Sequence, residues 1–349
     1  MKRKEYPLLI SDCLIIEKEM YFFAKNYNAL FVLNLVSGKK SFLGRLPDEH
    51  LFGSNLVQSI QIWGEQLIFV PKAMKADKIW MYDLKRQLWN SIEVTFDGVK
   101  YPYEKIAYSF IYNEFLVLIG CYYNGIVRIN LNNKSMEYYL NIFDKEEKIH
   151  SLFCCELDGE NLIIPSPNKN QVYIINLNSL KIRTYKVGND ECIYSGICKC
   201  GDYYWLSPRC TCPYVVRWDG ERETRIYALP EEIKTNGAYI FSGINHIGDD
   251  IYMIGGEGKK SLVFSGYNYS EKKIMPESHS FHKCGRDNEY IVQDYDGKLS
   301  ILWDGIKYEY DFLLDMDDEF FVDSARRLDA DSIVESKGID LNLFVNMLN

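Results

Sequence analysis

The amino-acid sequence predicts an all-β fold, a seven-bladed β-propeller of four-stranded antiparallel blades followed by a short helical C-terminal tail. A unit of short apolar strands recurs seven times along the 349 residues, close to the roughly 40 to 50 residues that are typical of a propeller blade. Aromatic residues make up 15% of the chain, and such rings cover pleated sheets well. A propeller lets these units pack blade against blade, whereas an open stack would expose apolar faces at both ends.

A serine opens the first strand of each unit and marks where each blade begins. The seven serines are Ser11, Ser59, Ser109, Ser151, Ser195, Ser242 and Ser280. We expect each hydroxyl to bond the backbone of a neighbouring blade, because serine side chains bond readily to main-chain groups. A catalytic nucleophile would not recur seven times, and no G-x-S-x-G motif surrounds any of these serines. Serine hydrolysis is therefore not predicted.

Three further strands complete each unit. The second strand is a compact aromatic or aliphatic run, expected at 20–23, 67–70, 115–119, 162–164, 203–206, 251–254 and 290–292. The third strand, expected in the first four units at 30–35, 78–84, 126–131 and 172–177, closes on an Asn or Asp that favours a turn. The fourth strand is more polar, as in residues 181–187, and its alternation indicates an outer, half-solvated position.

Two units carry a more specific motif. In the second, the strand 79–84 contains the turn residue Asp83 and is followed by Trp89; in the sixth, the strand 251–254 ends in Gly255-Gly256. These features resemble the kelch repeat of galactose-oxidase-like central propellers. Elsewhere the positions of that Asp and Trp hold Asn34, Asn130 and Asn176, and Phe42, Tyr138 and Tyr185. The resemblance implies a propeller over residues 5 to 315 but hardly a function, since propellers host enzymes, ligand binders and scaffolds alike.

The repeat predicts one propeller domain over residues 1–314, with blades starting near 11, 59, 109, 151, 195, 242 and 280. Residues 315–349 are expected to form an acidic linker and short C-terminal helices packed on the propeller, because residues such as Ile333, Leu341 and Phe344 recur at helix-like spacing. The sequence does not show how the ends of the propeller meet, and residues 5–10 could add an edge strand.

Charge and cysteine content restrict the partners and the compartment. A net charge of −9 argues against nucleic acid and anionic membranes, which need clustered positive charge. The apolar run after the basic start is too short for a signal peptide, and no stretch approaches membrane-spanning length. We expect a cytoplasmic protein whose ten cysteines are mostly reduced thiols.

The loops that join fourth to first strands and second to third strands share one face of a propeller, and this face is the expected binding surface. Its candidate residues are Tyr27, Lys72, Tyr108, Tyr122, Tyr123, His150, Tyr194, Arg209, Phe241, His279 and Tyr295. Rings interleaved with charged groups suit a protein or peptide partner, and a glycan is the alternative ligand. The competing interpretation is that these rings only seal the contacts between blades.

Three cysteines of the fifth unit, Cys192, Cys210 and Cys212, form a weak candidate zinc site, with His150 as a further ligand. Their C-x-C spacing does not match the usual zinc motif, so no metal is expected. Acidic residues such as Asp12, Glu257, Asp287 and Asp294 could serve a glycosidase on the same face, which needs two opposed carboxylates. No phosphate-binding or metalloprotease motif is present.

We therefore expect a non-catalytic binding module that recognises a protein or peptide and needs no cofactor. A carbohydrate-binding or carbohydrate-active propeller that uses the same face is the alternative.

Overall fold

The computed structural model describes most of the chain between residues 6 and 314. The described residues are 6–49, 55–72, 78–94, 106–120, 125–140, 154–210, 212–222, 224–233, 241–255, 260–265, 271–275, 280–283, 289–294 and 296–314. Within these ranges every regular element is a strand, and they hold no helix able to cross a membrane. The C-terminal helices expected within residues 315–349 lie outside the described residues.

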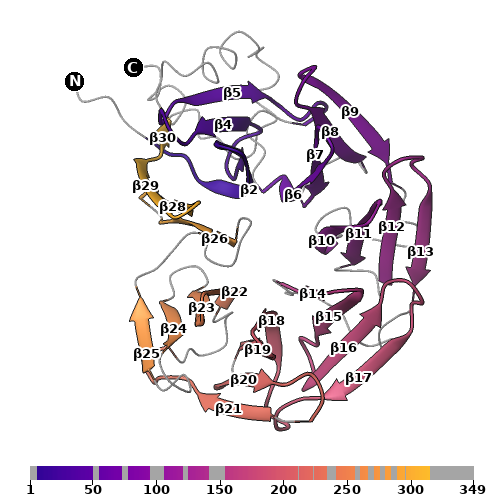
Figure 1. Ribbon diagram of the computed structural model, residues 1–349, viewed down its shortest axis with the longest axis vertical. Helices are drawn as coiled ribbons and strands as arrows, with labels where there is room; N and C mark the ends of the chain where they lie inside the picture. The colour runs from indigo at the N-terminus through magenta and orange to yellow at the C-terminus, as the bar shows by residue number, and fades with distance from the viewer. Residues whose placement is uncertain are drawn as a thin grey trace, which may run out of the picture. The chain divides into compact units, whose positions relative to one another are not determined.

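The strands form seven four-stranded antiparallel sheets, arranged as the blades of a β-propeller, which confirms the predicted fold class (Figure 1). The chain divides into two compact units. Among the described residues, the first unit holds blades 1 and 2 together with residues 296–300 and 307–314. The second unit holds residues 106–294 and 301–306.

Blades 1 and 2 belong to the first unit. Blade 1 comprises β2 (Ile10–Ile16), β3 (Glu19–Ala24), β4 (Leu30–Asn34) and β5 (Lys40–Gly44). Blade 2 comprises β6 (Val57–Trp63), β7 (Gln66–Pro71), β8 (Lys78–Asp83) and β9 (Leu88–Glu93). In both blades the strands lie in chain order, as four short strands joined by hairpins require.

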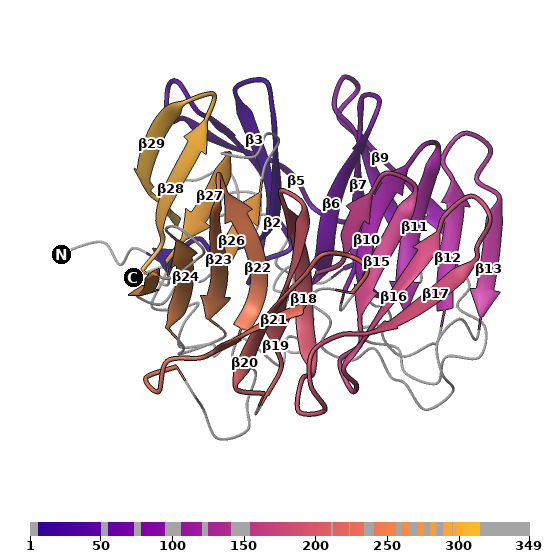
Figure 2. The same ribbon diagram turned by 60° about the horizontal axis from the view of Figure 1, so that its bottom comes forward.

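Blades 3 to 6 belong to the second unit, and Figure 2 shows their strands from the side. Blade 3 comprises β10 (Ile106–Tyr112), β11 (Phe115–Gly120), β12 (Gly125–Asn130) and β13 (Met136–Leu140). Blade 4 comprises β14 (Glu156–Asp158), β15 (Asn161–Pro165), β16 (Gln171–Asn176) and β17 (Ile182–Lys186). Blade 5 comprises β18 (Tyr194–Cys200), β19 (Tyr203–Pro208), β20 (Tyr214–Trp218) and β21 (Thr224–Ala228). Blade 6 comprises β22 (Phe241–Ile247), β23 (Asp250–Gly255), β24 (Ser261–Ser265) and β25 (Glu271–Met275).

Blade 7 comprises β26 (Ser280–Lys283), β27 (Tyr290–Gln293), β28 (Lys298–Trp303) and β29 (Ile306–Asp311). Two very short strands, β1 (Tyr6–Pro7) and β30 (Leu313–Leu314), pair with each other in a separate two-stranded sheet. The edge strand expected within residues 5–10 therefore exists, but it joins the other end of the described chain instead of extending a blade.

A β-bulge recurs near the start of the first strand. In blades 1, 2, 3, 5 and 6 the pairing with the second strand skips one residue. The skipped residues are Ser11, Gln58, Ala107, Ser195 and Ser242. A bulge bends its strand and increases the local twist, so each of these first strands enters its blade with the same distortion.

Three of the repeating serines, Ser11, Ser195 and Ser242, use their hydroxyls in two ways. Ser11 Oγ donates to the carbonyl of Val57 in blade 2 at 2.8 Å, as expected. Ser195 and Ser242 instead donate to second-strand carbonyls of their own blades, at 3.1 and 3.2 Å, and there the expectation is wrong. All three are bulge residues, so the bulge alone does not decide which carbonyl the hydroxyl reaches. Ser151 lies outside the described residues.

The Asn or Asp that ends the third strand builds the same turn in several blades. Asp83 Oδ1 accepts the backbone N–H groups of the residues two and three positions later, at 3.1 and 2.7 Å. Asn34, Asn130 and Asn176 accept the equivalent pair of N–H groups. An amide oxygen and a carboxylate oxygen accept the same bonds here, which explains why Asn replaces Asp between blades.

Apolar side chains between neighbouring sheets form the core. Phe23 of blade 1 contacts Phe69 of blade 2 with ring centroids 5.9 Å apart, and Trp205 of blade 5 contacts Phe264 of blade 6 at 5.8 Å. All four rings are buried. Because each sheet buries its faces against its neighbours, removal of this apolar surface from water is the main stabilising contribution.

Carboxylates of first strands also link neighbouring blades. Asp12 Oδ2 in blade 1 accepts the N–H of Ile60 in blade 2 at 2.6 Å, and Glu156 Oε2 in blade 4 accepts the N–H of Lys199 in blade 5 at 3.0 Å. Lys199 Nζ also lies 2.7 Å from Asp158 Oδ2. The N–H groups of Ile60 and Lys199, which point away from the second strands of their own blades, thereby gain hydrogen-bond acceptors.

Candidate functional site

The predicted loop-face residues divide into those that lie outside the described residues, those that are half-buried and those that are fully buried. Tyr122, Tyr123, His150, His279 and Tyr295 lie outside the described residues. Tyr27 and Lys72 in the first unit, and Tyr108 and Arg209 in the second, are half-buried.

Tyr194 and Phe241 are both 0% exposed, so their rings are not available to a ligand. For these two residues the prediction of a binding role is corrected. Each ring packs at the start of a first strand, in the apolar core that links its blade to a neighbour. The competing interpretation, that such rings seal contacts between blades, holds at these two positions.

Three loops of blades 4 and 5 meet and bring several of the predicted residues together. The loops are 166–170 between β15 and β16, 187–193 between β17 and β18, and the described residues 209–210 and 212–213 between β19 and β20. The Arg209 N–H donates to the carbonyl of Ile193 at 3.0 Å, and the Tyr194 N–H donates to the carbonyl of Ser166 at 3.2 Å. These backbone bonds hold the three loops against one another.

Arg209 ties two of these loops through its side chain. Its Nη1 donates to the carbonyl of Pro167 at 2.6 Å and to Asn168 Oδ1 at 3.0 Å. A guanidinium presents several donors in a fixed plane, so one side chain can hold two acceptors of a loop at once. Arg209 therefore acts as a clamp between blades 4 and 5, and its charge faces neutral oxygen atoms.

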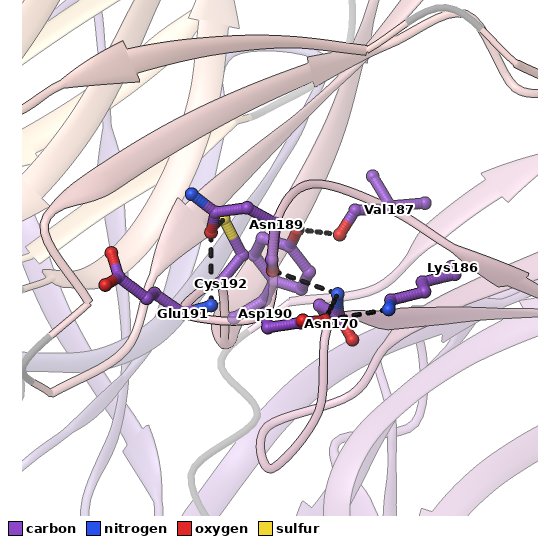
Figure 3. A network of polar contacts seen from close by, with 8 residues as sticks. Asn170, Lys186, Val187, Asn189, Asp190, Glu191 and Cys192 are labelled. Carbon is purple, nitrogen blue, oxygen red and sulfur yellow. Dashed lines mark hydrogen bonds and ion pairs between the residues drawn. The ribbon is translucent and has the colours of Figure 1, made fainter.

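An exposed polar network covers this region (Figure 3). Asn170 Nδ2 donates to the carbonyl of Asn189 at 2.9 Å and to Asp190 Oδ1 at 3.4 Å. Lys186 Nζ lies 2.7 Å from Asp190 Oδ1, and these side chains are 65% and 87% exposed. The hydrogen bond from Lys186 lowers the pKa of Asp190. Glu191 is also exposed, so the loop presents two carboxylates and one ammonium group to solvent.

Two buried thiols lie directly beneath this network. Cys192 and Cys212 are 0% and 2% exposed, and their side chains interact with each other. The interaction with Cys212 lowers the pKa of Cys192, whereas the same interaction and burial raise the pKa of Cys212. As a thiol, Cys192 Sγ can also donate to Asn189 Oδ1, 3.1 Å away.

Tyr194 and Gly188 close the space around the thiol pair. The Tyr194 hydroxyl donates to the carbonyl of Val187 at 2.6 Å, and burial raises the pKa of this phenol. Gly188 has φ +76°, and a Cβ there would lie 2.7 Å from Tyr194 Oη and 2.8 Å from Cys192 Sγ. The backbone at Gly188 therefore lies against the Cys192 thiol, with no room for a side chain between them.

The weak zinc candidate does not gather as a ligand set. Among the described residues, no three His, Cys, Asp or Glu side chains are placed to hold a metal ion. Cys210 is half-buried at φ +50°, whereas Cys192 and Cys212 form a buried pair. His150 lies outside the described residues.

One of the carboxylates considered for catalysis has a role in holding two blades together. Asp12 accepts a backbone N–H of the next blade, which is a structural role. Glu257 and Asp287 lie outside the described residues.

Sequence reasoning missed the exposed residues that form the network around Asn189, Asp190 and Glu191. The available signal was the run Gly188-Asn189-Asp190, because Gly, Asn and Asp favour turns that bond their own backbone. The nearby aromatic residue Tyr194 was predicted to bind instead, although its side chain is buried.

No family model matches this sequence, and no curated protein is a recognisable relative. Similar solved structures exist. A virginiamycin B lyase from Staphylococcus aureus has a TM-score of 0.63 at 15% identity, covering 85% of this chain and 97% of that one. Hsv2 from Kluyveromyces lactis has a TM-score of 0.55 at 10% identity, covering 88% and 98%.

A chain of the mitotic checkpoint complex has a TM-score of 0.57 at 13% identity, covering 85% of this chain and 90% of that one. At such identities these similarities show the fold alone. They support the propeller arrangement, and they do not single out propellers of the kelch type.

Proposed function

We propose that this chain is a non-catalytic binding module that recognises a protein or peptide through the exposed loops of blades 4 and 5. The observation that carries the proposal is a charged surface on a fixed backbone. Arg209 and Asn170 hold the loops through three hydrogen bonds of 3.0 Å or less, while Lys186, Asp190 and Glu191 face solvent. Loops fixed before binding lose little entropy when a partner docks.

The type of propeller, its compartment and its further contact residues belong to the same proposal. We propose a kelch-like propeller that acts in the cytoplasm, where adjacent cysteines such as Cys154 and Cys155 stay reduced. The half-buried Tyr108, and Tyr27 and Lys72 in the first unit, stay candidates for further contacts. Two of the similar solved structures, Hsv2 and the checkpoint complex, fit a binding module, and the lyase is an enzyme by its name.

A charge-reversal variant tests the proposal. In Asp190→Lys/Glu191→Lys the exposed carboxylates change sign, so a partner held by this surface should be lost from affinity capture. Capture from a lysate would be followed by mass spectrometry and by titration of the purified partner. We expect at least a tenfold weaker Kd for the variant, or about 1.4 kcal/mol.

The matched control reverses two exposed acids in other turns of blade 5. Asp202 lies in the turn between β18 and β19, and Glu221 in the turn between β20 and β21. Asp202→Lys/Glu221→Lys has the same change in net charge and should bind as the wild type does. Equal binding by all three proteins would rule out the proposed loops. If nothing is captured, a glycan array tests the carbohydrate alternative.

A further inference from the structure

We propose that Cys192 and Cys212 form an oxidisable dithiol, which a peroxide converts to an intramolecular disulfide and a thiol reductant restores. This inference goes beyond the proposed function, because the disulfide would form whether or not the nearby loops bind a partner. It rests on the placement of the two thiols, on their contrast with the other cysteines, and on what surrounds them.

The backbone holds the two thiols together. Cys192 precedes the first strand of blade 5, and Cys212 follows the second strand, so both lie at the same end of one hairpin. The bond from the Arg209 N–H to the Ile193 carbonyl extends this pairing, and the Cys212 N–H donates to the Arg209 carbonyl at 3.0 Å. This backbone pairing places both cysteines at one end of the hairpin, where their side chains interact, so a covalent bond between the sulfurs needs little movement.

The pair differs chemically from the half-buried Cys154 and the buried Cys155. Burial raises the pKa of Cys154 to about 11 and raises that of Cys155 as well, so both stay protonated and unreactive at neutral pH. Cys192, by contrast, has a neighbouring thiol that can stabilise its thiolate. Cys192 is therefore the nucleophile, and Cys212 is the thiol that resolves the intermediate.

The reaction balances with a peroxide as the oxidant. The Cys192 thiolate attacks one oxygen of hydrogen peroxide, the O–O bond breaks, and hydroxide leaves as Cys192 becomes a sulfenic acid. Cys212 sulfur then attacks the sulfenic sulfur. The S–S bond forms, the S–O bond breaks, and the departing oxygen leaves as water with the Cys212 proton. Two thiols and one peroxide give one disulfide and two waters.

Oxidation would alter the exposed loop above the thiols. A disulfide removes the hydrogen bond from Cys192 to Asn189 Oδ1 and the contact of Cys212 Sγ with the Tyr214 carbonyl at 3.5 Å. Asn189 also accepts the Glu191 N–H on the same Oδ1, and its carbonyl accepts from Asn170. The state of the thiols is thereby connected to the exposed polar network of Figure 3.

Peptide mapping of the full-length protein tests the proposal. Reduced protein is treated with a few equivalents of hydrogen peroxide, then denatured, alkylated and digested with trypsin. Trypsin leaves Cys192 with Cys198 on the peptide 187–199, and Cys210 with Cys212 on the peptide 210–217. We expect these peptides to become linked, to separate on reduction, and to link faster as the pH rises, because the thiolate is the attacking form and the pKa of Cys192 is lowered.

Single variants identify the two sulfurs. The link should persist in Cys198→Ser and Cys210→Ser and be lost in Cys192→Ser and Cys212→Ser, with circular dichroism checking that each variant is folded. A link that survives in Cys192→Ser or Cys212→Ser would overturn the assignment. So would a wild-type protein in which both cysteines remain fully alkylated after the peroxide treatment, a result that needs no variant.

Discussion

At the scale of the residue, Gly188 shows how closely the backbone approaches the thiol pair. Its φ of +76° is costly for any residue with a Cβ, and that Cβ would lie under 3 Å from both Tyr194 Oη and Cys192 Sγ. We expect Gly188→Ala to lower the free energy of unfolding by about 1 to 3 kcal/mol more than a glycine substitution at a similar φ without close neighbours. Urea denaturation measures this difference.

Gly201 is the matched control, because it has φ +58° and a Cβ added there would meet no atom within 4 Å. Gly201→Ala therefore carries only the backbone cost of about 1 to 2 kcal/mol. If the two alanine variants unfold at the same urea concentration, the close packing of Gly188 against Tyr194 and Cys192 is not what restricts this position.

The sequence could predict where the candidate site lies, but it could not predict which of its side chains are exposed to solvent. The strand order places the loops before β18 and after β19 together, so Cys192, Arg209 and Cys212 could be grouped in advance. Which side chains face solvent depends on the packing partners of each one. Tyr194 can be fully buried because its hydroxyl has a hydrogen-bond acceptor, the Val187 carbonyl. No sequence pattern predicts this acceptor.

At the scale of the element, β18 lies close to both neighbouring blades at Gly196, which contacts Cys154 just before β14 and Ile244 in β22. A Cβ at this position in β18 would lie 2.5 Å from Cys154 Sγ and 3.2 Å from Ile244 Cγ2. Gly196→Ala should therefore destabilise the protein by about 1 to 3 kcal/mol through overpacking. The urea midpoint, followed by tryptophan fluorescence, reports the loss.

Gly243 provides the control, because it follows the bulge of β22 as Gly196 follows that of β18, and its Cβ would have nothing within 4 Å. Gly243→Ala should be neutral or stabilising by up to about 1 kcal/mol. Adding Cys154→Ala to Gly196→Ala removes the clashing sulfur and should recover part of the loss. An equal cost at both glycines would contradict this account of the strand contacts.

The strands themselves were predictable, whereas their distortions were not. Apolar runs such as 67–70 and 115–119 coincide with β7 and β11 because fully buried strands need continuous apolar sequence. The bulge residues, by contrast, are serine in blades 1, 5 and 6 but Gln58 and Ala107 in blades 2 and 3, so no one residue type marks a bulge. A bulge is a property of the pairing between two strands, so no single strand encodes it.

At the scale of the whole molecule, the two ends of the described chain are joined within the first unit. Besides the β1–β30 pairing, the Leu8 N–H donates to the Phe312 carbonyl at 2.9 Å, and Tyr310 Oη donates to the Leu35 carbonyl at 2.6 Å. Residues about 300 positions apart thus hold one another. The sequence could not show this, because two-residue strands have no periodicity to detect.

Phe312 is the apolar centre of this junction, and its removal is the sharpest test of it. The ring is 3% exposed and lies 4.8 Å from the ring of Phe22, centroid to centroid. Phe312→Ala should cost about 3 to 5 kcal/mol, the range for a buried ring that leaves a cavity, whereas Ile306→Ala on the exposed side of β29 should stay within about 0.5 kcal/mol. Ile306 is 54% exposed, so it reports what an apolar truncation in blade 7 costs away from the junction. Urea denaturation of both variants decides the matter: similar midpoints would mean that the chain ends contribute little, and a large loss confined to Phe312→Ala would establish that their contact stabilises the propeller.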